Sequence, residues 1–274
     1  MDLNTITAVA RPQTREALPG WREGDAFLGG GTWLFSEPQP RLSRLIDLAA
    51  LGWEPLRRTP AGLEIAATCT VAELDSLAAP VEWTAAPLIG QCCRAFLASF
   101  KVWNTATVGG NLCLALPAGP MISLAAALNG VCTIWTPDGG ERRIDAASFV
   151  TAAERNVLLP GEILRRIDIS TAALTRRTAF RQISLTPVGR SAALLIGTRA
   201  PKDAGFVLTV TASTPHPVRL AFATMPSAAE LRARLERDIT AYHDDMHGLP
   251  AWRRHMTLHF AEEIRSELSA EPSR

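Results

Sequence analysis

The chain has 274 residues, a formal net charge of +1 at pH 7 and 47% hydrophobic residues. A net charge this close to zero gives no reason to expect binding to nucleic acid or to an anionic membrane surface. The first residues lack the basic and apolar regions of a signal peptide, and no apolar run is long enough to cross a bilayer. We therefore expect a cytoplasmic globular protein, with room for two domains or one large one.

The first part of the chain mixes strand and helix patterns. Residues 1–25 are expected to hold a strand and a short helix, and residues 26–28 a strand that leads into a glycine-rich turn. Residues 45–48 form an apolar run, and further strands are predicted at 63–67, 131–135, 142–144 and 161–169. Thr70 and Glu73 form a capping-box pattern, which predicts a helix from Thr70 to about Pro80. Helices are also predicted at 87–100 and, buried because it is apolar throughout, at 121–128.

The pattern changes after about residue 171. Strands are predicted at 179–185, 192–198, 206–212 and 218–223. A second capping box, Ser227 to Glu230, opens a helix, and a last helix is expected at 251–268. Strands followed by helices indicate a separate α+β unit. We therefore divide the chain into a domain of residues 1–170, with lobes at about 1–55 and 56–170, and a C-terminal domain of residues 171–274.

Two glycine-rich segments are the candidate ligand sites. The first glycine segment runs Leu28, Gly29, Gly30, Gly31, Thr32, Trp33, Leu34, and the second runs Thr107, Val108, Gly109, Gly110, Asn111. Because glycine lacks a Cβ, a ligand can lie against backbone N–H groups, and a concave run of such groups suits a phosphate or diphosphate. The first segment is neither a Walker loop nor a Gly-x-Gly-x-x-Gly fingerprint. We infer that both segments hold one diphosphate from two sides; the alternative is a pair of ordinary tight turns.

The order of these segments resembles a known family. After the first glycine segment come Leu45-Ile46-Asp47-Leu48, then residues 65–74, the second glycine segment with Pro117, and finally Gly161-Glu162-Ile163-Leu164. This succession is similar to the FAD-binding (medium) subunit of the molybdenum hydroxylases, the xanthine dehydrogenase and carbon monoxide dehydrogenase family. The resemblance covers nearly the whole chain, and Thr-Val-Gly-Gly-Asn is its most specific part.

The resemblance implies a fold and a function. The fold is α+β, with a two-lobed FAD-binding domain of the PCMH or vanillyl-alcohol-oxidase-like type and a smaller C-terminal domain of antiparallel sheet and helices. The function is electron transfer in an oxidoreductase complex. Electrons would come from [2Fe–2S] clusters of a small partner subunit, and FAD in this chain would pass them to NAD or another acceptor. A large partner subunit would carry the molybdopterin cofactor, in a dimer of heterotrimers.

The resemblance also implies roles for single residues. The first glycine segment would wrap the FAD diphosphate, with donors from Gly30, Gly31 and Thr32, and the second would hold its other side and the ribityl region. Three further positions are Thr68, which would add a hydroxyl contact, Leu164, which would lie near the flavin, and Arg181, which would approach the cofactor. An ordinary strand arginine is the alternative for Arg181. Leu97, aromatic in some relatives, is better interpreted as helix core.

Three positions depart from the family pattern. Many members carry an acid that hydrogen-bonds the cofactor where this chain has Pro120, a small polar or acidic residue at Trp33, and an arginine at Trp103. Pro120 and Trp33 keep open a second hypothesis, an assembly subunit that has lost FAD. A third hypothesis is a free-standing flavin oxidase with a related fold. The sequence shows no substrate-facing acid or base for the oxidase.

The cysteines and histidines predict no metal site and no catalytic side chain. The five cysteines form no Cys-x-x-Cys pair, and their apolar neighbours indicate buried, reduced thiols. His255 and His259 are four residues apart, but they lack the His-Glu-x-x-His pattern and are better explained as one helix face. No Ser/His/Asp constellation is evident. The proposed chemistry needs none, because the flavin itself would carry it out.

Overall fold

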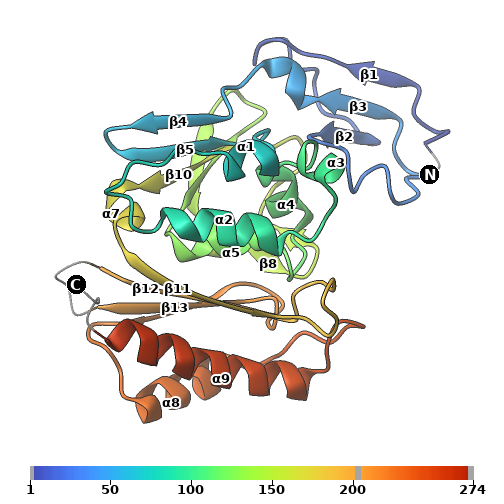
Figure 1. Cartoon of the computed structure of the whole chain (residues 1–274). Helices are drawn as coiled ribbons and strands as arrows, with labels where there is room; N and C mark the ends of the chain where they lie inside the picture. Colours follow the sequence, from blue (N-terminus) through green and yellow to red (C-terminus); the bar gives the residue numbers. More distant parts are fainter. Residues whose placement is uncertain (1–2, 201–204, 271–274) are drawn as a thin grey trace.

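Three sheets carry most of the chain in the computed structural model, which describes residues 3–200 and 205–270. The N-terminal lobe, at the top of Figure 1, holds a parallel sheet in the order β1-β3-β2. Its elements are β1 (Ala8–Ala10), β2 (Asp25–Leu28), β3 (Arg44–Asp47) and the 3-10 helix η1 (Leu48–Leu51). Because β2 and β3 are parallel, the first glycine segment leaves the same end of the sheet as η1.

The second lobe is built on an antiparallel sheet in the order β4-β5-β10-β6-β7. These strands are β4 (Leu56–Thr59), β5 (Gly62–Ala66), β6 (Val131–Trp135), β7 (Glu141–Asp145) and β10 (Ile163–Ser170). Its helices are α1 (Val71–Asp75), α2 (Ala86–Ala95), α3 (Phe100–Trp103), α4 (Val108–Leu114), α5 (Pro120–Ala127), α6 (Ala146–Phe149) and α7 (Thr171–Leu174), with a small hairpin of β8 (Val150–Ala152) and β9 (Arg155–Asn156). Every residue of α5 is buried, as its uniformly apolar sequence predicts.

The C-terminal domain is an antiparallel sheet covered on both faces. Its elements are β11 (Arg177–Ile183), β12 (Ala193–Arg199), β13 (Phe206–Thr211), β14 (Val218–Phe222), α8 (Ala228–Asp238) and α9 (Pro250–Ser269). Figure 1 shows this sheet between the second lobe and the helices α8 and α9. Alternating residues of β12 serve the two faces: Leu194 and Ile196 join the core of the second lobe, and Leu195 joins the core under α9.

The predicted α+β class is confirmed, and so are the strands and both capping boxes. Two helix predictions are wrong in extent, and a third helix is not formed. The helix after Thr70 ends at Asp75, and the one predicted at 87–100 ends at Ala95. There the Trp103 indole donates to the Phe96 carbonyl, 3.0 Å away, and so bonds a carbonyl at the helix end. Residues 11–24 form turns and bends in place of a short helix.

Stacked arginine and tryptophan side chains join the two lobes. The Trp53 and Trp135 rings meet edge to face with centroids 5.3 Å apart, and the Arg165 guanidinium lies 4.2 Å from the Trp53 ring centroid. Arg15, from the N-terminal lobe, lies 4.5 Å from the Trp135 centroid. Such contacts are cation–π interactions. They help to fix the position of the N-terminal lobe on the second-lobe sheet.

No helix in residues 3–200 or 205–270 is both long and apolar enough to span a membrane.

Candidate functional site

The first glycine segment presents unused backbone donors. It follows the carboxyl end of β2, and Gly31 adopts a positive φ of 71°, which glycine accepts without strain. A 2.8 Å bond from the Phe35 N–H to the Gly31 carbonyl closes the turn. The N–H groups of residues 30–34 donate no hydrogen bond to any part of the chain that the structure describes. Five half-buried residues therefore leave their donors for a ligand.

The second glycine segment differs from the turn that its sequence suggests. Thr107 is the N-cap of α4, so residues 108–111 form the first turn of a helix. Their N–H groups are already bonded: Val108 to the Cys69 carbonyl, Gly109 to the Ala67 carbonyl, Gly110 to the Thr107 hydroxyl and Asn111 to the Thr107 carbonyl. The expectation that Gly110 and its neighbours offer free backbone donors is not met. What this segment offers is one exposed residue without a side chain, Gly110.

The polar side chains of the second segment keep some hydrogen-bonding capacity. The Asn111 side-chain oxygen accepts from the Met121 N–H, 3.1 Å away, and so caps α5. This contact orients the amide, whose NH₂ group has no partner in the described part of the chain. Pro120 is the first residue of α5, a position where proline is favoured. The Thr107 hydroxyl accepts from Gly110 and can still donate its own hydrogen.

The fold brings the two glycine segments into direct contact. A Cβ at Gly30 would overlap the carbonyl oxygen of Thr105, and one at Gly29 would lie 3.0 Å from the Thr107 hydroxyl. Gly109 is packed equally closely, since a Cβ there would lie 2.5 Å from the Ala67 Cβ. Gly110, in contrast, is exposed. The two lobes thus bring the segment with free N–H groups against the segment that carries exposed Gly110, an arrangement that suits a diphosphate.

The other three predicted site residues, Thr68, Leu164 and Arg181, lie in different parts of the fold. Thr68 is half-buried and follows Ala67, whose carbonyl accepts from Gly109, so it lies beside the second segment. Leu164 is only 2% exposed and packs in the core of the second lobe. Arg181 is not brought to the glycine segments. Its guanidinium bonds Glu263 at 2.6 Å and Glu267 at 2.8 Å, so it points toward α9 on the far side of the sheet.

One residue near the site was missed by the sequence reasoning. Arg190, in the loop between β11 and β12, places its guanidinium carbon 5.4 Å from the centroid of the Trp33 ring. The C-terminal domain therefore reaches the first glycine segment. A lone arginine in a loop carries no sequence pattern, so only the tertiary structure reveals this contact.

A buried ion pair anchors the strand that leads into the site. Asp25, at the start of β2, accepts from Arg44 Nε at 2.8 Å and from the Arg22 N–H at 2.9 Å. The side-chain hydrogen bond from Arg44 holds the pKa of the Asp25 carboxyl below its ordinary value, and the backbone bond from Arg22 acts in the same direction. Fixing β2 in this way fixes the glycine segment that follows it.

We expect this pair to make the stability of the N-terminal lobe acid-sensitive. Because the folded-state pKa of Asp25 is lowered, the stabilisation is present above the ordinary aspartate pKa and is lost as the pH falls through the folded-state value. Urea unfolding of the wild type and of Asp25→Asn across this acid range checks it. Asp25→Asn should be less stable near neutral pH and should lose less stability on acidification. Parallel acid profiles would contradict the assignment.

The thiols and histidines form no centre with the glycine segments. Burial raises the pKa of the Cys113 thiol to about 12, so this cysteine stays protonated at neutral pH. His255 and His259 stack with their rings 6.4 Å apart, and His259 lies 3.1 Å from Glu263. In the described ranges 3–200 and 205–270, no group of three or more His, Cys, Asp or Glu residues is placed to hold a metal ion.

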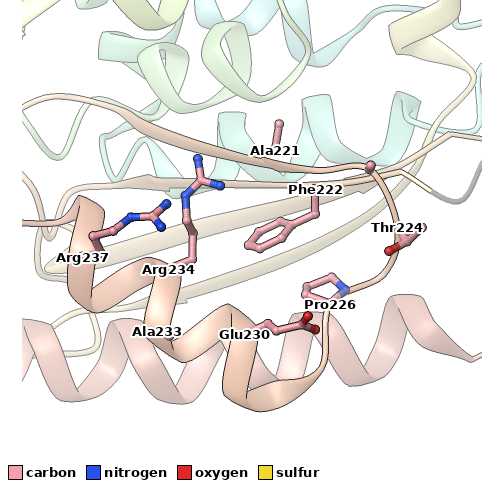
Figure 2. Close-up of a pocket in the computed structure, with 9 residues that line it drawn as sticks. Ala221, Phe222, Thr224, Pro226, Glu230, Ala233, Arg234 and Arg237 are labelled. Atoms are coloured by element: carbon pink, nitrogen blue, oxygen red, sulfur yellow. The ribbon is translucent and has the colours of Figure 1, made fainter.

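A hollow of about 550 Å³ lies elsewhere, between β14 and α8 (Figure 2). Arg234 and Arg237 line it, but both bond to Asp238, at 2.5 and 2.8 Å. The two guanidiniums share this one carboxylate, which holds both of them in place. This hollow opens beside α8, which Figure 1 places away from both lobes. It is not part of the glycine-segment site.

Two lobes with touching glycine segments, on a third sheet-and-helix domain, define a two-lobed cofactor-binding protein. The family model of the FAD binding domain in molybdopterin dehydrogenase matches residues 7–171. The chain therefore belongs to this family, which confirms the resemblance drawn from the sequence, the oxidoreductase class and FAD as the family's cofactor.

Solved structures support the same fold along the whole chain. Quinoline 2-oxidoreductase from Pseudomonas putida 86 matches with a TM-score of 0.76 and 17% identity, over 97% of this chain and 98% of that one. The carbon monoxide dehydrogenase from Hydrogenophaga pseudoflava gives 0.78 and 18%, over 95% and 96%. Reconstituted carbon monoxide dehydrogenase from Oligotropha carboxidovorans gives 0.79 and 20%, over 97% and 99%. No curated protein matches the chain.

Proposed function

We propose that this chain is the FAD-binding electron-transfer subunit of a molybdopterin-dependent hydroxylase or dehydrogenase complex. The observation that carries the proposal is the contact between the two glycine segments. The first segment carries the unused N–H groups of residues 30–34, and its Gly29 approaches Thr107, whose hydroxyl accepts from exposed Gly110. Such donors suit the diphosphate of FAD.

The proposed site has three parts. Leu28, Gly29, Gly30, Gly31, Thr32, Trp33 and Leu34 hold the diphosphate through backbone donors. Thr107, Val108, Gly109, Gly110 and Asn111 form the opposite wall, with polar contacts from Thr107, Asn111 and Thr68. Leu164 supports the flavin region from the core. Arg181 would join the site only by breaking its ion pairs with Glu263 and Glu267 of α9.

In this function the chain binds and orients its cofactor, and FAD, when bound, supplies the redox chemistry. We further propose that the chain receives electrons from a small partner subunit with [2Fe–2S] clusters. It would work beside a large subunit with molybdopterin, and its acceptor would be NAD or another carrier. A cytoplasmic dimer of heterotrimers completes the proposal. Its domain limits are 1–170 and 171–274, which the division of the strands among sheets supports.

A titration of the purified full-length chain with FAD tests the proposal. We expect quenching of flavin fluorescence at a ratio of one FAD per chain, and release of intact FAD when the loaded protein is acidified. The proposed cofactor role would be contradicted if the folded chain bound no FAD either alone or with its partner subunits.

Trp33 and Pro120 favour one second candidate, an assembly subunit that keeps the fold without FAD. Arg190 covers the Trp33 ring, and Pro120 serves as the first residue of α5, so both have structural explanations that need no cofactor. A colourless, folded chain within an intact and active complex would favour this candidate.

A further inference from the structure

Arg190 is an arginine without a charge partner in the described part of the chain. It makes no ion pair or hydrogen bond with residues 3–200 or 205–270, and it is exposed. Its loop is nevertheless well defined. The Gly189 N–H donates to the Thr186 carbonyl at 3.0 Å, and Gln182 donates to the hydroxyl of buried Ser191 at 2.8 Å. Hydrogen bonds therefore hold the two residues on either side of this cation.

The contact that Arg190 makes is with the first glycine segment. Its guanidinium lies 5.4 Å from the Trp33 ring centroid, within the range of a cation–π interaction. An aromatic face orients a guanidinium without cancelling its charge, whereas a carboxylate would cancel it. Arg181 meets two carboxylates, and Arg234 and Arg237 share a third, so each of these arginines is held by an acid. Arg190 keeps its charge, and it contacts the side chain of a residue whose segment carries free N–H groups.

We propose that Arg190 binds the diphosphate of the cofactor, as a contribution of the C-terminal domain to the site. This inference rests on the proposed function, since it assumes that FAD binds at the glycine segments. A guanidinium matches phosphate oxygens with two parallel hydrogen bonds, and these charge-assisted bonds are stronger than neutral ones. The N–H groups of residues 30–34 would hold one side of the diphosphate while Arg190 closes the other. FAD binding would then join the C-terminal domain to the N-terminal lobe.

The test compares three single variants of the full-length chain by FAD titration at low and at high salt. Arg190→Ala removes the charge, and Arg190→Lys keeps the charge without the two-pronged geometry. Arg41→Ala is the matched control, because Arg41 is an exposed arginine like Arg190. Arg41 belongs to the N-terminal lobe and precedes β3, so it lies at the opposite end of the parallel sheet from the first glycine segment. Thermal unfolding of each variant verifies the fold.

We expect Arg190→Ala to weaken FAD binding about tenfold to a hundredfold and to flatten its salt dependence. Arg190→Lys should fall between Arg190→Ala and the wild type, and Arg41→Ala should match the wild type. If the wild type binds FAD and Arg190→Ala binds it equally well or more tightly, the inference fails while the proposed function stands. If the folded wild type binds no FAD, even with its partner subunits, both fail.

Discussion

Replacing Gly110 with valine is expected to abolish FAD binding and to leave the fold largely intact. Gly110 is exposed, and the nearest atom to an added Cβ is the Thr107 hydroxyl oxygen, 2.8 Å away. The branched side chain would therefore fill space at the proposed cofactor wall. We expect FAD affinity to fall about a hundredfold or more. Any loss of stability should stay near the value of the Thr107 cap, about 1 kcal/mol.

The neighbouring Gly109 is packed where Gly110 is exposed, so its replacement is expected to act first on stability. A Cβ at Gly109 would lie 2.6 Å from the Ala67 carbonyl oxygen, so the backbone itself must shift. Gly109→Ala should lower the free energy of unfolding by about 1–3 kcal/mol, as overpacking does. Urea unfolding and FAD titration of both variants separate the two roles. Full FAD occupancy in Gly110→Val would disprove the placement of the site.

Among the substitutions considered, Arg253→Ala is expected to lower the free energy of unfolding the most. Arg253 on α9 is 1% exposed and bonds to the Asp245 carboxylate. It also donates to the carbonyls of Gly248 at 2.9 Å, Ala192 at 2.7 Å and Ala212 at 2.5 Å. One side chain thus ties α9 to the ends of β12 and β13. Removing it leaves several buried acceptors without donors, which costs about 3–5 kcal/mol.

The adjacent residue is a matched control for this prediction. Arg254 pairs with Glu236 at 2.7 Å, but its side chain is 49% exposed. Arg254→Ala should therefore change the free energy of unfolding by less than about 1 kcal/mol. Urea unfolding of both variants, with circular dichroism as the probe, makes the comparison. Equal effects at the two positions would show that Arg253 does not hold the C-terminal domain together.

The sequence predicted the features that depend on local patterns. Both capping boxes, the buried helix of residues 120–127 and the strands follow from residue types and spacing, and the structure contains them. Helix ends were less predictable. The Trp103 indole bonds the carbonyl of Phe96, and no spacing rule anticipates that contact.

The candidate site was predictable in its residues and less so in its chemistry. The two glycine segments could be named from the sequence. Their contact depends on how the two lobes pack, and the bond from the Gly109 N–H to Ala67 depends on packing within the second lobe. Arg190 could not be found from the sequence, because Trp33, which its guanidinium contacts, is distant in sequence and belongs to the N-terminal lobe.

The close packing of Gly30 against Thr105 and of Gly109 against Ala67 bears on how this chain could diverge over evolutionary time. Both glycines are required by the fold, whether or not a cofactor is bound. Selection for folding alone would therefore preserve most of the glycine pattern in a descendant that had stopped using FAD. The fold does not require glycine at position 110, so this residue would be free to change. A relative with Gly30 and Gly109 but a bulky residue at the position of Gly110 would be expected to be a folded protein without flavin.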